Sequence, residues 1–379
     1  MRINVLVNAP WGPTAYSNMA RVYGPRIAAL GHAVSMTAMW GLDGGPIVYN
    51  GIPVFPRHVD KLARDVAGAH AYAWKSDVFM SWCDAFVVEP KTLGAMPWAA
   101  WCPVDADPVS PHLVPLLQQA HWPLVYSRWG TERAREGGVE HARYMPIGID
   151  TTVFQPQDRA EARRKLELPA DAYIVGMVAA NIKGDRKAYP QQLRAFAEFK
   201  RKHPEAMLVI HALKDHAHGG VDLQAACDSL GLVTGRDVWF CHQYAYNTGQ
   251  LNDAYLATFY AAIDVLLSVT QAEGFGIPIV EAAACGRPAI VGQWSAMRDL
   301  NFSRLGVDEA DTVRIFNRFD TWWWLPRPEA ITEQLERARR GAHPDAETLR
   351  SCALRYDVDR VMRLYWAPLL EEMEGEVCA

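Results

Sequence analysis

The chain has 379 residues, half of them hydrophobic, and its formal net charge is −5 at pH 7. This composition excludes a disordered chain and predicts two domains, each large enough to bury a core of its own. The acidic net charge excludes a general attraction to nucleic acid or anionic lipid, although a local basic patch remains compatible with it.

Signals for targeting and for covalent cross-links are weak. No stretch reaches the roughly 18 apolar residues that a membrane-spanning helix needs, and the apolar segment 1–7 is too short for a signal peptide. The seven cysteines are scattered and include no C-x-x-C pair, which favours buried thiols over disulfides or a zinc knuckle. We therefore expect a soluble protein of the cytoplasm.

In the first part of the chain, short apolar segments alternate with segments of helical periodicity. We predict strands at residues 3–9, 33–40, 85–88, 99–102 and 124–126, and helices at residues 16–30 and 111–120. This order is typical of a parallel sheet with helices on both faces. Residues 1–155 are therefore predicted to form one doubly wound α/β domain.

A polar run at residues 155–159 interrupts the alternation, which then starts again. We predict helices at residues 160–166, 190–202, 251–262 and 278–285, and strands at residues 173–179, 206–213, 238–243, 264–270 and 288–292. Residues 156–355 are thus predicted to form a second doubly wound α/β domain. The remaining segment, 356–379, has helical periodicity over most of its length.

The most informative motif lies where a predicted strand gives way to a helix. Glu273 and Glu281 stand on either side of a Gly-Phe-Gly turn, Gly274 to Gly276. A helix that begins near Pro278 presents N–H groups and its positive dipole end to a bound anion, and glycine lets a ligand approach the backbone closely. The carboxylates can accept hydrogen bonds from hydroxyl groups. An anion together with a polyol indicates a sugar nucleotide.

This motif, E-G-F-G-I-P-I-V-E, resembles the core of the retaining glycosyltransferases of family four. Flanking stretches resemble the same family in the expected order, at residues 127–130, 145–150 with Phe154, 260–265 and 282–291. Such a spread of matches is more specific than a single motif. The resemblance implies the GT-B fold, in which two Rossmann-like domains face a cleft, the first binding the acceptor and the second the nucleotide-sugar donor. It also implies that the final helix, 356–379, packs back on the first domain.

The resemblance assigns roles around the two glutamates. It implies that Glu281 holds the ribose hydroxyls of the donor and that Glu273 contacts the transferred sugar. The N–H groups of Phe275, Gly276 and Ile277 would bind donor oxygens. Considered alone, both glutamates are compatible with ordinary carboxylates of a loop and of a helix start.

A cluster of cations, Lys183, Arg186 and Lys187, follows the predicted strand 173–179. It lies at the carboxyl end of a strand, where open α/β sheets bind ligands. Cations there suit a diphosphate, although charge clusters of this kind are usually solvated turns. With the resemblance, Arg186 and Lys187 become the pyrophosphate candidates and Lys183 a reserve candidate. Asn181, which stands where the family usually has arginine, is a further donor-binding candidate.

Four residues of the first domain are candidates for contact with the acceptor or the transferred sugar. Trp11, Gly12 and Tyr16 follow the first predicted strand, where relatives have a glycine-rich loop, and the two aromatic rings offer a stacking platform. Aromatic side chains at such positions are more often part of the core. Asp105 follows the fourth predicted strand, where many relatives have a His-Asp pair. A valine precedes it here, so the role of that histidine does not carry over.

Two patterns invite a metal ion but are better explained without one. Asp105 and Asp107 match a D-x-D pattern, yet a metal needs more oxygen ligands, and the fold stabilises the leaving diphosphate with helix ends and cations. His211, His216 and His218 lack a fourth ligand at metal-binding spacing. We therefore expect no metal and no cofactor besides the nucleotide-sugar substrate.

Two aromatic segments of the second domain receive simpler interpretations. Tyr244 lies in a loop where relatives seat the nucleotide base, and it is a donor-binding candidate for that reason. The run Trp322-Trp323-Trp324 is predicted to pack against the final helices.

Together these features predict a metal-independent retaining glycosyltransferase that moves a sugar from a nucleotide diphosphate to an acceptor hydroxyl. Residues 11–14 and 103–105 resemble a branch found in bacteriophages and bacteria, so the candidate acceptors are a glycan, a small molecule or a modified, hydroxymethylated DNA base. Two alternatives stay open. One is a sugar-nucleotide epimerase or hydrolase of the same fold, and the other is a catalytically silent subunit that only binds a sugar nucleotide.

Overall fold

The computed structural model describes residues 1–182 and 185–377, and the chain divides into two compact units. Unit 1 contains residues 1–146 and 318–321 and the residues from 360 onward, whereas unit 2 contains residues 147–317 and 322–359. The first segment of unit 1 therefore ends at Pro146, whereas the predicted first domain ends at residue 155. Unit 1 also includes a short late segment, 318–321, that the sequence pattern does not distinguish.

Unit 1 is built on a sheet with the strand order β3-β4-β2-β1-β5-β6-β7-β8. The strands are β1 (Arg2–Val7), β2 (Ala33–Ala38), β3 (Ile47–Tyr49), β4 (Ile52–Phe55), β5 (Val78–Trp82), β6 (Trp98–Cys102), β7 (Trp122–Val125) and β8 (Arg143–Tyr144). β3 pairs with β4 in antiparallel orientation, and the pairs from β4 to β8 are parallel. From β4 to β7 this is the Rossmann order, which reverses between β1 and β5.

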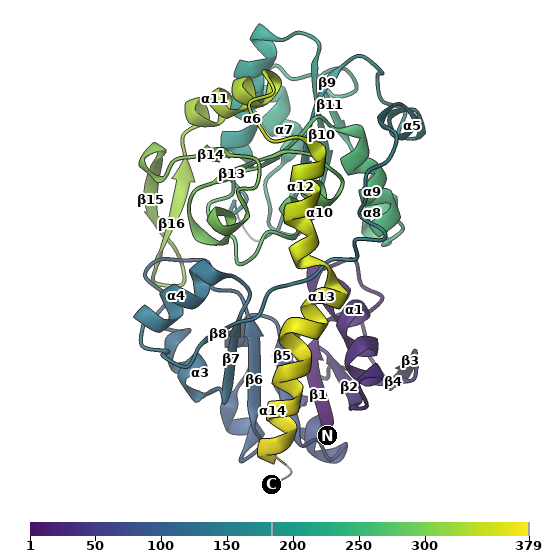
Figure 1. Ribbon diagram of the computed structural model, residues 1–379, viewed down its shortest axis with the longest axis vertical. Helices are drawn as coiled ribbons and strands as arrows, with labels where there is room; N and C mark the ends of the chain where they lie inside the picture. The colour runs from purple at the N-terminus through teal and green to yellow at the C-terminus, as the bar shows by residue number, and fades with distance from the viewer. Residues whose placement is uncertain (183–184, 378–379) are drawn as a thin grey trace. The chain divides into compact units, whose positions relative to one another are not determined.

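Helices connect these strands, and the end of the chain returns to the same unit. The helices are α1 (Ala15–Ala29), α2 (Ala67–Ala73), α3 (Val114–Gln119), α4 (Arg128–Glu136) and α14 (Ala367–Val377), with short 3-10 turns at Ala85–Val87 and Pro90–Leu93 and a π-helical turn at Met362–Trp366. The short helix α13 (Val358–Val361) begins in unit 2 and ends in unit 1. Thr14 starts α1, because its side chain accepts a hydrogen bond from the N–H of Ser17. In Figure 1, α14 crosses one face of the sheet.

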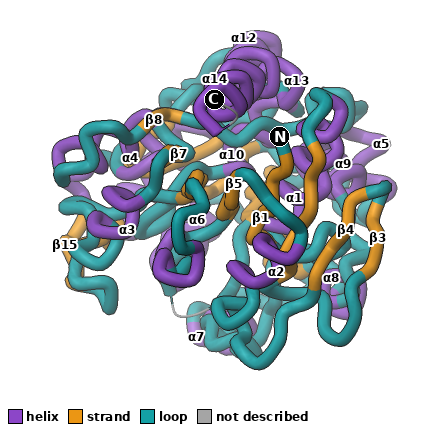
Figure 2. Tube along the Cα trace, turned by 90° about the horizontal axis from the view of Figure 1, so that it is seen from below, coloured by secondary structure: helices purple, strands orange, loops and turns teal. Residues whose placement is uncertain are grey.

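An aromatic cluster forms the centre of the unit 1 core. Tyr23 of α1, Trp82 of β5, Trp101 of β6 and Trp366 near the C-terminus are all fully buried. The ring centroid of Trp101 lies 4.9 Å from those of both Tyr23 and Trp366, in edge-to-face orientation. Such pairs add about 0.5–1.5 kcal/mol beyond their buried area. The N-terminal ammonium pairs with Glu374 at 2.6 Å, and Figure 2 shows the N-terminus beside α14.

Unit 2 is built on a parallel sheet with the order β11-β10-β9-β12-β13-β14. The strands are β9 (Tyr173–Val178), β10 (Ala206–His211), β11 (Val238–Phe240), β12 (Val265–Ser268), β13 (Ala289–Gly292) and β14 (Leu305–Val307). The helices are α5 (Arg159–Lys165), α6 (Tyr189–Lys202), α7 (Leu223–Ser229), α8 (Gln243–Asn247), α9 (Asp253–Ala262), α10 (Ile277–Ala284), α11 (Pro328–Arg339) and α12 (Ala346–Ala353), with 3-10 turns at Ser295–Leu300, Glu309–Asp311 and Leu354–Tyr356. This is again the Rossmann order.

Between β14 and α11, the chain forms a two-stranded antiparallel ribbon. It consists of β15 (Thr312–Phe316) and β16 (Trp322–Pro326), paired from Thr312↔Pro326 to Phe316↔Trp322. The three consecutive tryptophans therefore belong to a strand, and the packing of their rings against the final helices stays a prediction. Trp324 is buried against Trp294, whereas Trp322 is 40% exposed.

One predicted strand is also wrong. Residues 85–88 form a 3-10 turn at Ala85–Val87, and the strand lies earlier, at Val78–Trp82. Both segments are short and apolar, so periodicity alone does not distinguish them. The predicted alternation of parallel strands and helices in both halves of the chain is confirmed. Among the described residues, no helix is both long and apolar enough to cross a bilayer.

Candidate active site

The strand order of unit 2 reverses between β9 and β12, which pair in parallel. In open α/β sheets, the segments that follow two such strands form the crevice that binds ligands. Here these are the described residues 179–182 and 185–188, after β9, and residues 269–276, after β12. They include most of the donor-site residues predicted from the sequence.

The segment after β12 turns into α10 at Gly276, whose φ of +106° lies in the left-handed region. A β-carbon at this position would lie 2.9 Å from Cδ1 of Ile279, so conformation and space both favour glycine. Pro278 lies in the first turn of α10, where its fixed φ suits the helix and its missing N–H costs nothing. The turn therefore places the positive end of the α10 dipole at the carboxyl edge of the sheet.

Glu273 pairs with two cations from the segment after β9. Lys187 Nζ donates a hydrogen bond to Glu273 Oε2 at 2.5 Å, and Arg186 Nη1 lies 3.9 Å from Glu273 Oε1. Arg186 Nη1 also donates to the carbonyl of Ala272 at 2.5 Å. Burial acts to raise the pKa of Glu273, but the charges of Lys187 and Arg186 outweigh it and the pKa is lowered. The carboxylate is therefore ionised at neutral pH and fixes both cations at the crevice.

Two glutamines join the segments on either side of the switch point. Gln271 donates through Nε2 to the carbonyl of Asp185 at 2.7 Å, and its N–H donates to the carbonyl of Arg186 at 2.8 Å. Gln192 of α6 donates through Nε2 to the carbonyl of Lys187 at 2.7 Å, and its Oε1 accepts from the N–H of Val269 at 3.1 Å. Because these amides are mostly buried, each bond costs more to break than an exposed one. The backbone that carries the cations is thus held in register with the backbone that carries Glu273.

A second contact fixes the backbone of Glu273 from the segment after β13. The N–H of Glu273 donates to Ser295 Oγ at 3.1 Å, and the carbonyl of Glu273 accepts from the N–H of Ala296 at 3.1 Å. Ser295 itself has a φ of +49°, which is unusual for serine. Sequence reasoning missed Ser295, Gln271 and Gln192, because nothing in their local pattern signals contacts with residues this distant in the chain.

Glu281 has a different environment from Glu273. Its side chain is 4% exposed on α10, and Tyr260 Oη donates a hydrogen bond to Glu281 Oε2 at 2.7 Å. Burial raises the pKa of Glu281 to about 8, although the bond from Tyr260 opposes that rise. Glu281 is therefore mostly protonated at neutral pH, whereas Glu273 is ionised. Two carboxyl groups whose environments drive their pKa values apart are typical of functional sites.

The remaining donor-site candidates divide into three groups. Gly274, Gly276 and Ile277 lie in the turn and first residue of α10, and the buried Phe275 ring contacts Tyr356 at a centroid distance of 5.6 Å. Tyr244, on α8, is 67% exposed. Lys183 lies outside the described residues.

Asn181 has contacts that differ from those of a ligand-binding side chain. It is 2% exposed, and its Nδ2 donates to the carbonyls of Leu213 at 2.9 Å and Val221 at 2.7 Å. Its Oδ1 accepts from the N–H of Val221 at 2.9 Å. The amide therefore ties the segment after β9 to the segment after β10, a structural role that we assign to it in place of direct donor contact.

The acceptor-side candidates lie in unit 1, near its own switch point between β1 and β5. Tyr16 Oη donates to Asp84 Oδ2 at 3.0 Å, and burial raises the pKa of Tyr16 well above its usual value. Trp11 is 40% exposed and its Nε1 donates to the carbonyl of Gly41 at 2.8 Å. Asp84 follows β5 and is not a candidate from the sequence, because the sequence pattern predicts the strand at residues 85–88.

The other two acceptor-side candidates follow β1 and β6. A β-carbon on Gly12 would collide with Ser17 Oγ and with the ring of Trp40, so the loop after β1 needs glycine there. Asp105 is half-buried and lies three residues after the end of β6. Trp11, Gly12, Tyr16 and Asp105 thus all lie on segments at the carboxyl edge of the unit 1 sheet.

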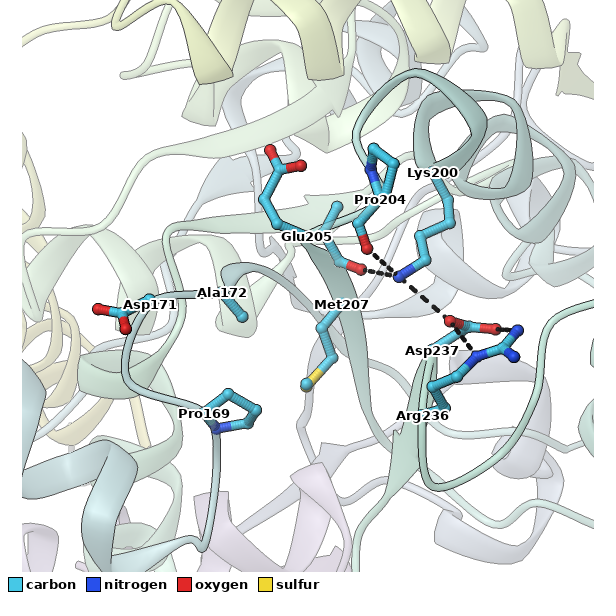
Figure 3. A pocket seen from close by; sticks show the side chains of 10 residues that line it. Pro169, Asp171, Ala172, Lys200, Pro204, Glu205, Met207, Arg236 and Asp237 are labelled. Carbon is cyan, nitrogen blue, oxygen red and sulfur yellow. Dashed lines mark hydrogen bonds and ion pairs between the residues drawn. The ribbon is translucent and has the colours of Figure 1, made fainter.

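A separate cavity of about 510 Å³ lies at the opposite edge of the unit 2 sheet, where β9, β10 and β11 begin (Figure 3). Lys200 Nζ lies 3.1 Å from Asp237, which also pairs with Arg236 at 2.7 Å. Lys200 donates in addition to the carbonyls of Pro204 and Ala206. These charges satisfy one another, and sheets of this kind bind ligands at the carboxyl edge. The crevice after β9 and β12 is therefore the stronger candidate.

Comparison with known proteins identifies the unit that contains this crevice. Residues 172–306, from β9 to β14, match the family model for glycosyl transferases of group 1. Unit 2 thus contains a segment that is similar to the glycosyl transferases of group 1. This segment contains Arg186, Lys187, Glu273 and Glu281, so the resemblance predicted from the glutamate motif is confirmed. Assignment to a bacteriophage branch stays a prediction.

A curated relative extends the comparison beyond the group 1 domain model. The D-inositol 3-phosphate glycosyltransferase of Acidothermus cellulolyticus is 30% identical over 182 residues, which are 46% of this chain and 39% of the relative. The chain thus spans about two fifths of the length of that relative.

Solved structures show that the segment that matches the group 1 model belongs to a GT-B chain. Sucrose-phosphate synthase from Thermosynechococcus elongatus matches with a TM-score of 0.78 at 17% identity, over 99% of this chain and 100% of the other. HepE from Anabaena, solved in complex with UDP-glucose, matches with a TM-score of 0.66 at 17% identity, over 98% of this chain and 100% of the other. The predicted GT-B fold, with two Rossmann-like units, is confirmed.

Proposed function

We propose that the chain is a retaining glycosyltransferase that moves a sugar from a nucleoside diphosphate to an acceptor hydroxyl without a metal ion. The observation that carries this proposal is the ionised Glu273, held by Lys187 and Arg186 beside the N-terminus of α10. The group 1 family match over this crevice supports it. So does the solved complex of a protein with the same fold and UDP-glucose.

The leaving diphosphate gains negative charge as the glycosidic bond breaks, and three positive features meet that charge. Arg186 offers a planar fork suited to phosphate oxygens, Lys187 offers a compact charge, and the first N–H groups of α10 add the helix dipole. The two cations are held in place before the donor binds. Glu273 pairs with their side chains, and Gln271 and Gln192 donate hydrogen bonds to the backbone of the segment that carries them. Such preorganised charge is commonly the largest contribution to catalysis, and it performs here the task that a metal performs in other transferases.

In this proposal, the two glutamates contact different parts of the donor. Glu281, on the inner face of α10, accepts from or donates to the ribose hydroxyls, which its protonated state allows. Glu273 accepts a hydrogen bond from a hydroxyl of the transferred sugar while it keeps its cations. Neither carboxylate attacks the anomeric carbon in this proposal.

Retention follows if the acceptor enters on the face from which the diphosphate leaves. The bond between the anomeric carbon and the phosphate oxygen breaks, and a bond from the acceptor oxygen to the same carbon forms on that face. The acceptor proton passes to a phosphate oxygen of the departing diphosphate. The acceptor itself is a glycan, a small molecule or a hydroxymethylated DNA base, held by the segments that carry Trp11, Tyr16 and Asp105 of unit 1.

Labelled nucleotide sugars with and without candidate acceptors test the proposal. With chelator present, we expect release of nucleoside diphosphate, and a product whose anomeric configuration by NMR equals that of the donor. Inversion would exclude retention, and loss of activity in chelator would exclude the metal-independent reaction. Conversion or hydrolysis of the donor alone would indicate an epimerase or hydrolase, and binding without turnover would indicate a silent subunit.

A further inference from the structure

The β15–β16 ribbon contacts the donor-site backbone at its base. The N–H of Trp324 donates to the carbonyl of Gln271 at 3.1 Å, and Gln271 in turn bonds Asp185 and Arg186. The Trp324 ring stacks on Trp294 at a centroid distance of 6.5 Å. Trp324 is 1% exposed, so the base of the ribbon is part of the unit 2 core. The backbone of Gln271 is thereby hydrogen-bonded directly to β16.

The tip of the same ribbon, residues 318–321, belongs to unit 1. Ser110 Oγ donates to the carbonyl of Phe319 at 2.7 Å, and Thr321 Oγ1 donates to the carbonyl of Pro108. The ring of Phe319 lies 5.6 Å from that of Phe86. The two hydrogen bonds attach the tip to residues 108–110, which lie three to five residues after the acceptor-side candidate Asp105, and the ring contact attaches it to Phe86.

The contacts at the tip differ in strength. His112 Nε2 lies 2.7 Å from Asp320 Oδ2, but both side chains are more than half exposed, and exposed ion pairs contribute only about 0–1 kcal/mol. Thr321 is 1% exposed, so its hydrogen bond to the Pro108 carbonyl is shielded from water. Phe319 and Thr321 are therefore the residues that anchor the tip.

We propose that the β15–β16 ribbon is a positioning element for the transfer reaction, which transmits occupation of the donor site from Gln271 through Trp324 to residues 105–112. This inference rests on the proposed function, because it takes the crevice after β9 and β12 as the donor site and Asp105 as part of the acceptor side. A short two-stranded ribbon suits this role, because its cross-strand hydrogen bonds make the two strands move together. Through this ribbon, residues 105–112 respond to whether the donor is bound.

Hydrogen exchange of the full chain with and without UDP-glucose or GDP-mannose tests this inference. In the wild type, we expect the nucleotide sugar to slow exchange at residues 269–276 and, by about threefold or more, at residues 105–112. In the double variant Phe319→Ala, Thr321→Val, the slowing at 269–276 should persist while that at 105–112 is lost. Phe316→Ala, which truncates an exposed ring on the same ribbon, is the matched control and should behave as the wild type.

The outcomes separate this inference from the proposed function. Retained slowing at 105–112 in the double variant would overturn the inference, because the donor would then act on that segment directly. The inference is also overturned if, in the wild type, the nucleotide sugar slows hydrogen exchange at residues 269–276 but not at residues 105–112. If neither nucleotide sugar slows exchange at 269–276, the proposed donor site fails, and the inference fails with it. The single variant Phe319→Tyr keeps the ring and leaves Thr321 unchanged, and it should show the wild-type slowing at residues 105–112.

Discussion

The hydroxyl of Tyr260 donates a 2.7 Å hydrogen bond to the carboxyl group of Glu281, and both side chains are buried. Burial raises the pKa of Glu281 to about 8 from a usual value of 4.5, so the native state keeps a proton there that the unfolded chain releases. The stabilising effect of this proton is fully present below pH 4.5 and is lost as the pH rises through 8.

Glu281→Gln removes this titration. Relative to the wild type, the free energy of unfolding of the variant should rise between pH 5 and pH 9, by on the order of 3 kcal/mol, because each pKa unit corresponds to about 1.4 kcal/mol. Urea unfolding at the two pH values measures it. The exposed Glu347→Gln is the control, and the difference between its free energy of unfolding and that of the wild type should be the same at both pH values. Equal pH dependence in Glu281→Gln and the wild type would contradict the assignment.

Lys187→Ala removes the cation that donates to Glu273 at 2.5 Å. We expect turnover to fall by about a hundredfold or more, as when one preorganised charge is removed from an active site. The pKa of Glu273 should also rise, so activity of the variant should decline at a higher pH than that of the wild type as the medium is acidified. Rates of nucleoside diphosphate release across pH measure both. Lys202→Ala, at the end of α6 and 65% exposed, should leave them unchanged.

Gly276→Ala places a β-carbon where φ is +106°. The substitution should lower the free energy of unfolding by about 1–2 kcal/mol, because a left-handed conformation costs an L-residue about that much, and it should weaken donor binding. Gly375→Ala, in α14 with open space around it, should instead stabilise by about 0.5–1 kcal/mol. Chemical denaturation and calorimetric titration with UDP-glucose distinguish the two. A neutral Gly276→Ala would show that the turn does not need glycine.

Asn181→Ala distinguishes a structural role from direct donor contact. Because the buried amide bonds the backbone of Leu213 and Val221, its removal leaves polar groups without partners and should cost about 1–3 kcal/mol of stability. Donor affinity of the folded variant should change less than twofold. A large loss of affinity at unchanged stability would restore Asn181 to the donor site.

The parts of the molecule that could be predicted from the sequence are those encoded locally. The glutamate motif contains its own turn, in which glycine precedes Pro278 at the start of a helix, so Glu273 and Glu281 could be placed on the correct elements. The alternation of apolar strands with helices gave both sheets, because strands buried on both faces are continuous apolar runs. Arg186 and Lys187 are candidates because they follow a strand and because of the family resemblance, and their contact with the diphosphate stays a prediction.

What the sequence could not predict depends on contacts between distant segments. Gln271 and Ser295 have no local signature, and their roles follow only when β9, β12 and β13 are adjacent. Asn181 was aligned with a ligand-binding arginine, although in the structure its amide closes a loop. The β15–β16 ribbon was missed because three consecutive tryptophans lack the alternation that marks a half-buried strand.

The fully buried Trp366 has a consequence for synthesis of the protein on the ribosome. Unit 1 needs that ring against Trp82 and Trp101, and so it lacks a piece of its centre until residue 366 has emerged. Unit 2 uses no residue beyond 359. The later-encoded half therefore has all its residues available first, and the half translated earliest waits longest to finish folding.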